Sequence, residues 1–189
     1  MPDPPMAADE RRQARFEAMY QAYRGPVLGY VLRRTETPED AADVVAETFL
    51  TLWRRLDEVP PEPETRLWLY GVARKALANH HRGERRRSAL AGRLRDDLAA
   101  FYQPPEFTAE LAAIIAAFRR LPGEQRELLA LEAWEGLDYG QIATVLGCSR
   151  NAVRIRMHRA RQRLTRELAG TPGHVPRNPE PSHLNGDRV

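Results

Sequence analysis

Residues 148–164, CSRNAVRIRMHRARQRL, hold six arginines and no acidic residue. Their apolar residues recur at intervals of four, three and four, which is the spacing of one stripe on an α-helix. This stripe consists of Val153, Met157, Ala160 and Leu164. A solvated helix normally pairs its cations with glutamates one turn away. Because these residues contain no acid, we expect the stripe to pack on the protein and the cationic face to bind an anion.

Capping residues before this segment predict a helix-turn-helix. Asp138 can cap a short helix and form a capping box with Gln141, Gly147 suits a left-handed turn, and Ser149 can cap the cationic helix. The second helix of such a motif lies in the DNA major groove, where arginine binds guanine and phosphate. The predicted contacts with duplex DNA are Ser149, Arg150, Asn151, Arg154, Ile155, Arg156, His158, Arg159, Arg161 and Arg163. The alternative is a bundle helix whose arginines are merely solvated.

A second cationic segment, RLWLYGVARKALANHHRGERRR, begins with aromatic residues. Residues 66–95 contain nine basic residues and one acid, Glu84. Aromatic side chains beside a basic groove are typical of proteins that hold unstacked single-stranded bases. The candidate contacts are Trp68, Tyr70, Arg74, Lys75, Asn79 and Arg82. The alternative is that Trp68 and Leu69 belong to the core and that the basic run is a solvated face.

An acidic segment has the opposite character, with five acids and no base in residues 36–47. Glu39 and Asp40 can be explained by the preference of helix N-termini for acids, but Asp43 and Glu47 lie further along. One acidic and two basic segments indicate two kinds of partner, nucleic acid and a basic protein surface.

Helix signals in the first half of the chain predict the elements that position these residues. A helix is expected over 9–24, broken at Gly25 and Pro26, with a second helix to about residue 34. Thr37 as N-cap and Pro38 at the first position predict a helix to about residue 56. Its expected buried stripe is Ala41, Val45, Phe49, Leu52 and Leu56.

Prolines in DEVPPEPET predict a loop over residues 57–65, followed by a helix over 66–82 that ends near Gly83. Residues 87–108 are expected to be a linker, with a helical piece at 89–101. Four helical segments then fill residues 109–168, separated by glycine and proline.

The predicted fold is therefore all-α, with two small helical bundles joined by a flexible linker and the second containing the helix-turn-helix. The bundles are expected at residues 13–86 and 109–168, with disordered ends at 1–12 and 169–189.

Composition argues against several other classes of protein. No apolar run approaches the length of a membrane span and the first ten residues are not a signal peptide, so a cytoplasmic protein without a membrane partner is expected. The single cysteine, Cys148, excludes an internal disulfide and a cysteine-rich metal site. A metal hydrolase using His80 and His81 is a further alternative, but adjacent histidines point to different helix faces. We expect no cofactor, no metal and no catalytic activity.

Three motifs occur in the order found in bacterial RNA polymerase sigma factors of the small extracytoplasmic-function (ECF) group: TPEDAADVVAETFLTLWRRLD, RLWLYGVARKALANHHR and LPGEQRELLALEAWEGLDYGQIATVLGCSRNAVRIRMHRARQRL. The resemblance covers residues 13–168. It implies that the first bundle binds the β′ clamp helices of core RNA polymerase and melts the minus-ten element, with a flipped base held by the loop at 57–65. The second bundle would bind the minus-thirty-five element and the β flap.

The same resemblance implies roles for individual residues. Core polymerase would be bound by Asp40, Asp43, Val44, Glu47, Thr48 and Trp53, while the single-strand and duplex contacts named above would bind the minus-ten and minus-thirty-five elements. The sequence departs from the family at Ala46, Lys75, Asn79 and Ile155, where glutamine, asparagine, aspartate and a small polar residue are common. Such factors are often held by an anti-sigma protein. A stand-alone helix-turn-helix regulator remains the alternative function.

Overall fold

The computed structural model describes the backbone of residues 5–99 and 108–170, and the side chains of residues 9–82, 108 and 111–170. These residues form α-helices and one short 3-10 helix, with no strand in the described ranges, so the all-α prediction is confirmed. Contacts group the chain into two compact units. One unit comprises Met1–Gln103 and Ala130–Ile155, and the other comprises Pro104–Leu129 and Arg156–Val189.

The first helix, α1 (Pro5–Leu32), passes through Gly25 and Pro26 without a break, so the predicted interruption is wrong. An interior proline costs a helix about 3 kcal/mol. Val27, Tyr30 and Val31 follow it and are 0–1% exposed. Burial contributes about 1.5–3 kcal/mol for each large apolar side chain, so packing outweighs the proline. The helix also begins at Pro5, inside the segment that was predicted to be disordered.

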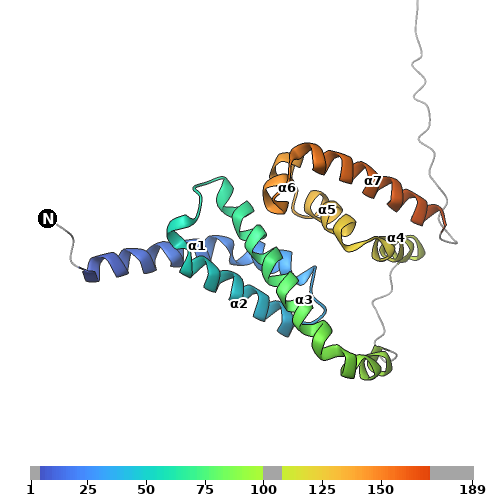
Figure 1. Cartoon of the computed structure of the whole chain (residues 1–189), viewed down its shortest axis with the longest axis horizontal. Coiled ribbons are helices and arrows are strands. Elements are labelled where there is room, and N and C mark those ends of the chain that lie inside the picture. Colours follow the sequence, from blue (N-terminus) through green and yellow to red (C-terminus); the bar gives the residue numbers. More distant parts are fainter. Residues whose placement is uncertain (1–4, 100–107, 171–189) are drawn as a thin grey trace, which may run out of the picture. The chain divides into compact units, whose positions relative to one another are not determined.

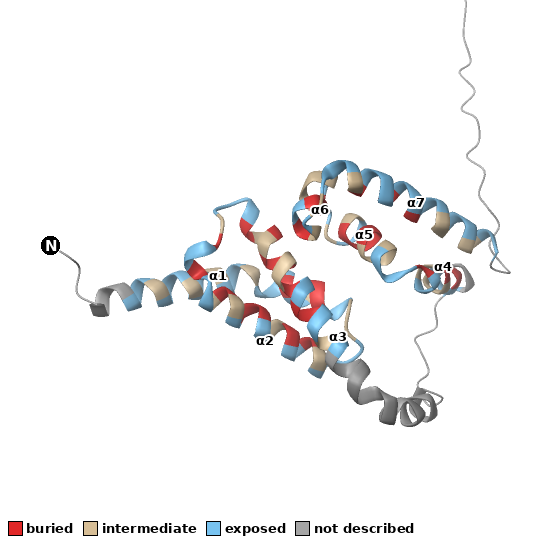
Figure 2. Ribbon diagram, in the orientation of Figure 1, coloured by how far each residue is buried: buried red, intermediate tan, exposed pale blue. Residues whose placement is uncertain are grey.

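The second helix, α2 (Pro38–Arg54), begins as predicted, with the Thr37 hydroxyl accepting a hydrogen bond from the Asp40 N–H at 3.1 Å. Its buried face differs from the expected stripe, because Val44 and Thr48 are buried while Val45 is only half-buried. Residues 41, 44, 48 and 52 follow the helical period and share one face. Figure 2 shows buried and exposed residues alternating along α2 accordingly.

A 3-10 turn, η1 (Leu56–Glu58), follows α2, and α3 (Glu64–Ala99) begins two residues before the predicted start. The loop predicted over 57–65 is therefore shorter and comprises residues 59–63. The predicted helix end near Gly83 is wrong, because α3 continues to Ala99 and includes much of the segment expected to be a linker. Residues 100–107 of the predicted linker lie outside the described residues.

Helices α1, α2 and α3 pack against one another in the first unit (Figure 1). The Tyr30 ring of α1 stacks on the Tyr70 ring of α3, with their centroids 4.8 Å apart. Further buried side chains of this core are Ala41, Val44, Leu52, Leu56, Leu69 and Ala73. This bundle holds the acidic face of α2 and the cationic face of α3 on a rigid frame.

The remaining helices are α4 (Ala109–Arg120), α5 (Gly123–Ala133), α6 (Tyr139–Leu146) and α7 (Arg150–Ala169). Thr108 caps α4 by accepting a hydrogen bond from the Leu111 N–H at 3.3 Å. In the second unit, Arg120 of α4 donates to the Glu167 carboxylate of α7 at 2.8 Å and to the Glu167 carbonyl at 2.9 Å. Residues 171–189 of the predicted tail lie outside the described residues.

Candidate nucleic-acid interface

Local hydrogen bonds build the predicted turn between α6 and α7. The Asp138 carboxylate accepts from the Gly140 and Gln141 N–H groups at 2.6 and 3.0 Å, and the Gln141 side chain accepts from the Asp138 N–H at 3.0 Å. These two backbone donors lower the pKa of Asp138 below its ordinary value of 3.8. Gly147 adopts the left-handed conformation at φ 64°, and the Ser149 hydroxyl accepts from the Ala152 N–H at 3.1 Å. The capping box, the glycine turn and the serine cap are therefore confirmed.

The cationic helix α7 buries the predicted stripe and exposes its opposite face. Val153, Met157 and Ala160 are 0% exposed, whereas Leu164 is half-buried. The predicted contact residues other than Arg163 are all exposed, and Ile155 is 43% exposed. The buried stripe therefore leaves one continuous face of α7 available to a large partner.

The residues of this face are ordered around the helix axis. At 3.6 residues per turn, the positions of residues 150–164 farthest from the buried stripe are 151, 155, 158, 159 and 162. Arg154 and Arg161 flank this strip on one side, and Arg156 and Arg163 flank it on the other. A strip with one arginine, Arg159, between two rows of arginines matches a major groove, where base edges lie between two phosphate backbones. Gln162, which was not among the predicted contacts, belongs to the strip and is exposed.

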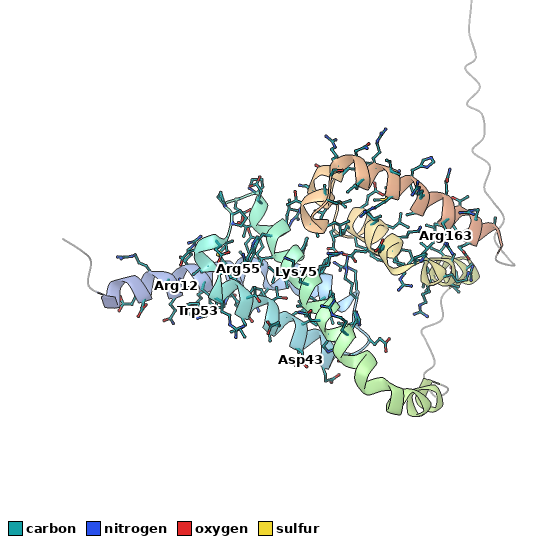
Figure 3. The ribbon with its side chains drawn as sticks, in the orientation of Figure 1. Arg12, Asp43, Trp53, Arg55, Lys75 and Arg163 are labelled. Atoms are coloured by element: carbon teal, nitrogen blue, oxygen red, sulfur yellow. The ribbon has the colours of Figure 1, made fainter. Side chains whose placement is uncertain are left out.

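Arg163 has an acid of its own helix within reach. Its Nε atom is 3.8 Å from Oε1 of Glu167, and its side chain is 43% exposed. Arg163 is labelled near the C-terminal end of α7 in Figure 3. Part of its charge is therefore balanced within the protein.

The α3 residues predicted to bind single-stranded DNA divide between a surface and the core. Trp68 is half-buried, and Lys75, Asn79 and Arg82 are exposed. Spacings near seven, four and three residues put these four on one face of the helix. Arg74 is exposed but belongs to a neighbouring face. The structure therefore brings an aromatic ring and two cations into one row, and Lys75 marks its middle in Figure 3.

Tyr70 is the predicted contact that this row does not include. It is 3% exposed and its ring is stacked on Tyr30. Burial raises the pKa of its phenol above the ordinary value. A ring in this position has no free face for a DNA base, so Tyr70 supports the fold of the surface and cannot itself stack on a base.

Arg55 extends the α3 row at its aromatic end. Its guanidinium carbon lies 5.9 Å from the centroid of the Trp68 ring, and its side chain is hydrogen-bonded to Glu58. The hydrogen bond and charge of Glu58 raise the pKa of Arg55. Sequence reasoning missed Arg55, although an arginine pair at the C-terminal end of α2 is visible in the motif LWRRLD.

The loop between η1 and α3 is held at its second end by a buried threonine. Thr65 is 3% exposed, and its hydroxyl donates to the Pro60 carbonyl at 2.7 Å. Val59 is also buried, whereas residues 61–64 are exposed. The loop therefore projects a short exposed tip from anchored ends beside the Trp68 row.

The acidic face of α2 carries Asp43 and Glu47, and both are exposed. Asp40 is less free, because its carboxylate accepts from the Thr37 hydroxyl at 2.7 Å and lies 3.2 Å from Nε2 of His80. Asp43 is labelled toward the N-terminal end of α2 in Figure 3. A basic protein surface could contact Asp43 and Glu47 directly.

Three other residues that the resemblance assigned to polymerase binding take part in packing. Val44 is 2% exposed and Thr48 is 0% exposed, with the Thr48 hydroxyl donating to the Val44 carbonyl at 2.7 Å. The Trp53 ring is half-buried and meets the Phe16 ring edge-on, with centroids 5.3 Å apart. Val44 and Thr48 therefore have almost no exposed side-chain surface for a partner, whereas Asp43, Glu47 and Leu50 are exposed.

Within the described residues, no group of three or more His, Cys, Asp or Glu side chains is arranged to hold a metal ion. His80 pairs with Asp40, and the His80 and His81 rings lie 6.2 Å apart at an interplanar angle of 76°. None of the helices in that part of the chain is long and apolar enough to cross a membrane.

Two family models match the chain in the order of its helices. The family described as Sigma-70 region 2 matches residues 19–87, which include α2 and the Trp68 row. The family described as Sigma-70, region 4 matches residues 111–164, which include the helix-turn-helix.

Curated relatives extend this similarity over most of the chain. The sequence is 31% identical over 156 residues to the RNA polymerase sigma factor CnrH of Cupriavidus metallidurans, covering 76% of this chain and 82% of the relative. It is 27% identical over 166 residues to the RNA polymerase sigma-H factor of Pseudomonas aeruginosa, covering 81% of this chain and 86% of the relative.

Solved structures show the same fold. CnrH in complex with the cytosolic domain of CnrY has a TM-score of 0.57 at 26% identity, covering 82% of this chain and 89% of that one. The sigma factor RpoE of Bartonella quintana, in complex with the anti-sigma factor NepR, has a TM-score of 0.58 at 20% identity, covering 82% of this chain and 97% of that one.

Proposed function

The chain belongs to the ECF group of RNA polymerase sigma factors, and we propose that α7 and α3 divide promoter recognition between them. A sigma factor recognises promoters and directs transcription initiation, and the family is not a family of enzymes. The observation that carries the proposal is the acid-free exposed face of α7 on a correctly capped helix-turn-helix. A stand-alone helix-turn-helix regulator is not favoured, because region 2 accounts for the N-terminal helices.

The minus-thirty-five element is bound by α7 in this proposal. Ile155 and His158 of the central strip face the base edges together with Arg159, while Arg154 and Arg156 reach the phosphates on either side. Exposed Ile155 favours contact with a thymine methyl group over a hydrogen bond to a base.

The minus-ten element is bound as a single strand along α3. Trp68 offers an aromatic face, and Lys75 and Arg82 on the same face neutralise the DNA backbone. The exposed tip of the loop at 57–65 receives a flipped base. Lys75, which stands where the family usually has asparagine, would then influence base preference.

Core polymerase is bound through the acids of α2 and through the second bundle. Asp43 and Glu47 face the β′ clamp helices, and their charge complements a basic partner surface. The second bundle contacts the β flap. We propose that the two bundles span residues 13–86 and 109–168. We also propose that the protein acts in the cytoplasm, because core polymerase and promoter DNA are its proposed partners.

An anti-sigma factor is a further proposed partner. The relative CnrH was solved in complex with the cytosolic domain of CnrY. A partner that covers exposed surfaces of a sigma factor would compete with polymerase and DNA for them.

Run-off transcription tests the proposed function. The purified chain is added to core polymerase on a library of genomic fragments, and transcripts are mapped by sequencing. We expect discrete start sites that share two upstream sequence elements and disappear without the chain. A well-folded chain that directs polymerase to no start site would refute the proposal.

A further inference from the structure

Arg12 lies before residues 19–87, the part of the chain that matches sigma region 2. On α1 it nevertheless continues the face that packs on α2, because Phe16, Met19 and Tyr23 follow it at helical spacing and all four are half-buried. A long arginine stem can cover apolar surface while its guanidinium reaches a polar target. Arg12 therefore occupies a packing position at the end of the α1–α2 contact.

The Arg12 guanidinium joins three features at the end of α2. Its Nη2 atom donates to the Trp53 carbonyl at 2.8 Å, and its Nη1 atom donates to the Asp57 carboxylate at 2.7 Å. The guanidinium carbon also lies 5.3 Å from the centroid of the Trp53 ring. Figure 3 shows Arg12 and Trp53 labelled close together.

These contacts lie where α2 ends and the loop at 57–65 begins. The last carbonyls of a helix have no partner within the helix, so the donation to Trp53 satisfies one of them. The donation to Asp57 reaches η1, which leads into the loop, and the Thr65 hydroxyl at the start of α3 donates to the Pro60 carbonyl across the loop. The loop is thus anchored at both ends, and one anchor comes from a residue outside the region 2 match.

We propose that Arg12 is a positioning residue for promoter melting, acting by holding η1 so that the loop that follows it keeps the geometry that receives the flipped minus-ten base. The inference rests on the proposed function, because it assumes that this loop binds the single strand. It adds the N-terminal part of α1 to the machinery of promoter recognition. Arg12 itself does not touch the DNA.

If Arg12 only stabilised the fold, Arg12→Ala would weaken all binding functions of the chain equally. Asp57 is 77% exposed and the Arg12 side chain is 32% exposed, so solvent screens their ion pair and its loss would little affect global unfolding. A positioning role lowers affinity for the minus-ten strand and leaves other functions of the chain unchanged.

The test uses the full chain with core polymerase and a start site found in the run-off experiment. A fluorescein-labelled non-template oligonucleotide spanning the minus-ten element is titrated with holoenzymes carrying Arg12→Ala, Arg12→Lys or wild-type chain. Arg24→Ala is the matched control, since Arg24 is an exposed arginine of the same helix. Core affinity, affinity for a minus-thirty-five duplex and thermal unfolding are measured in parallel.

We expect Arg12→Ala to weaken oligonucleotide binding about three- to tenfold, as the loss of charge-assisted hydrogen bonds suggests. Arg12→Lys keeps the charge without the two-pronged donation, so it should restore only part of the affinity. In an Asp57→Asn background the effect of Arg12→Ala should shrink, because one of its acceptors is already weakened.

Wild-type oligonucleotide affinity in Arg12→Ala would overturn the inference while leaving the proposed function intact. An equal loss in oligonucleotide, duplex and core binding would also overturn it, since that pattern indicates a general structural role. Absence of any start site with the wild-type chain would instead refute the proposed function itself.

Discussion

Replacing Arg159 with alanine isolates the base-reading face of α7. Arg159 is exposed, one turn beyond Ile155 and on the side away from buried Met157. Alanine is the residue most favourable to an α-helix, and exposed substitutions usually change stability by less than about 0.5 kcal/mol. The variant should therefore fold normally, so a change in binding will report on the DNA contact.

The expected magnitude follows from the kind of contact that the position allows. An arginine that contacts guanine through two hydrogen bonds contributes about 1–3 kcal/mol of discrimination, which corresponds to about 5- to 150-fold in affinity. We expect a loss in this range on the cognate minus-thirty-five duplex and a much smaller loss on a scrambled duplex.

Arg156→Ala is the matched control because Arg156 is also an exposed arginine of α7, on the flank facing the phosphates. Losing a phosphate contact should weaken binding to both duplexes about equally and lower the slope of log affinity against log salt by about 1. Arg159→Ala should leave that slope nearly unchanged.

Fluorescence anisotropy between about 50 and 200 mM salt separates the two variants, because phosphate contacts dominate the salt dependence in this range. Each variant is titrated against the cognate and the scrambled duplex. If Arg159→Ala lowers affinity for both duplexes equally, or for neither, the assignment of this face to base edges is wrong.

Three further changes test other parts of the structure. Asp43→Arg should weaken association with core polymerase by reversing an exposed charge on α2. Glu17→Arg makes the same charge reversal at an exposed position of α1 and should not weaken it. Equal co-purification of both variants with core polymerase would contradict the α2 assignment. Met157→Ala should lower the free energy of unfolding by about 2–5 kcal/mol, because it leaves a cavity beneath a fully buried side chain; urea titration measures this, and a loss comparable to that of a surface substitution would count against the packing. Because the pKa of Asp138 is lowered in the folded state, its cap stabilises the fold above the ordinary carboxyl pKa of 3.8, and this stabilisation is lost as pH falls through the pKa of the folded state. Asp138→Asn should therefore reduce the drop in melting temperature below about pH 4. An unchanged dependence of melting temperature on pH in this range would argue against the cap.

Local signals in the sequence correctly predicted the starts of α2 and α6 and the turn before α7. Thr37, Asp138, Gly147 and Ser149 act within three residues of the groups they satisfy. A capping hydrogen bond or a left-handed glycine depends little on distant parts of the chain, so residue type and spacing are sufficient.

The buried stripe of α7 was predictable for a related reason. Three of its four residues are fully buried, because arginines occupy most of the remaining positions and leave one apolar face. In α2, apolar residues are more widely distributed, so Val44 and Val45 were equally plausible core residues by period alone. Packing against α1 and α3 selected Val44 and Thr48.

Tyr70 and Arg12 show what residue type alone leaves open. Both were compatible with a surface role, but α1 supplies the Tyr30 ring that stacks on Tyr70. The end of α2 supplies the carbonyl and η1 the carboxylate that accept from Arg12. Likewise, burial after Pro26 keeps α1 continuous despite the proline. The sequence by itself determined the helix caps, the cationic and acidic segments and the family. Only the tertiary structure decided which side chains are free to bind a partner, because burial depends on groups contributed by distant residues.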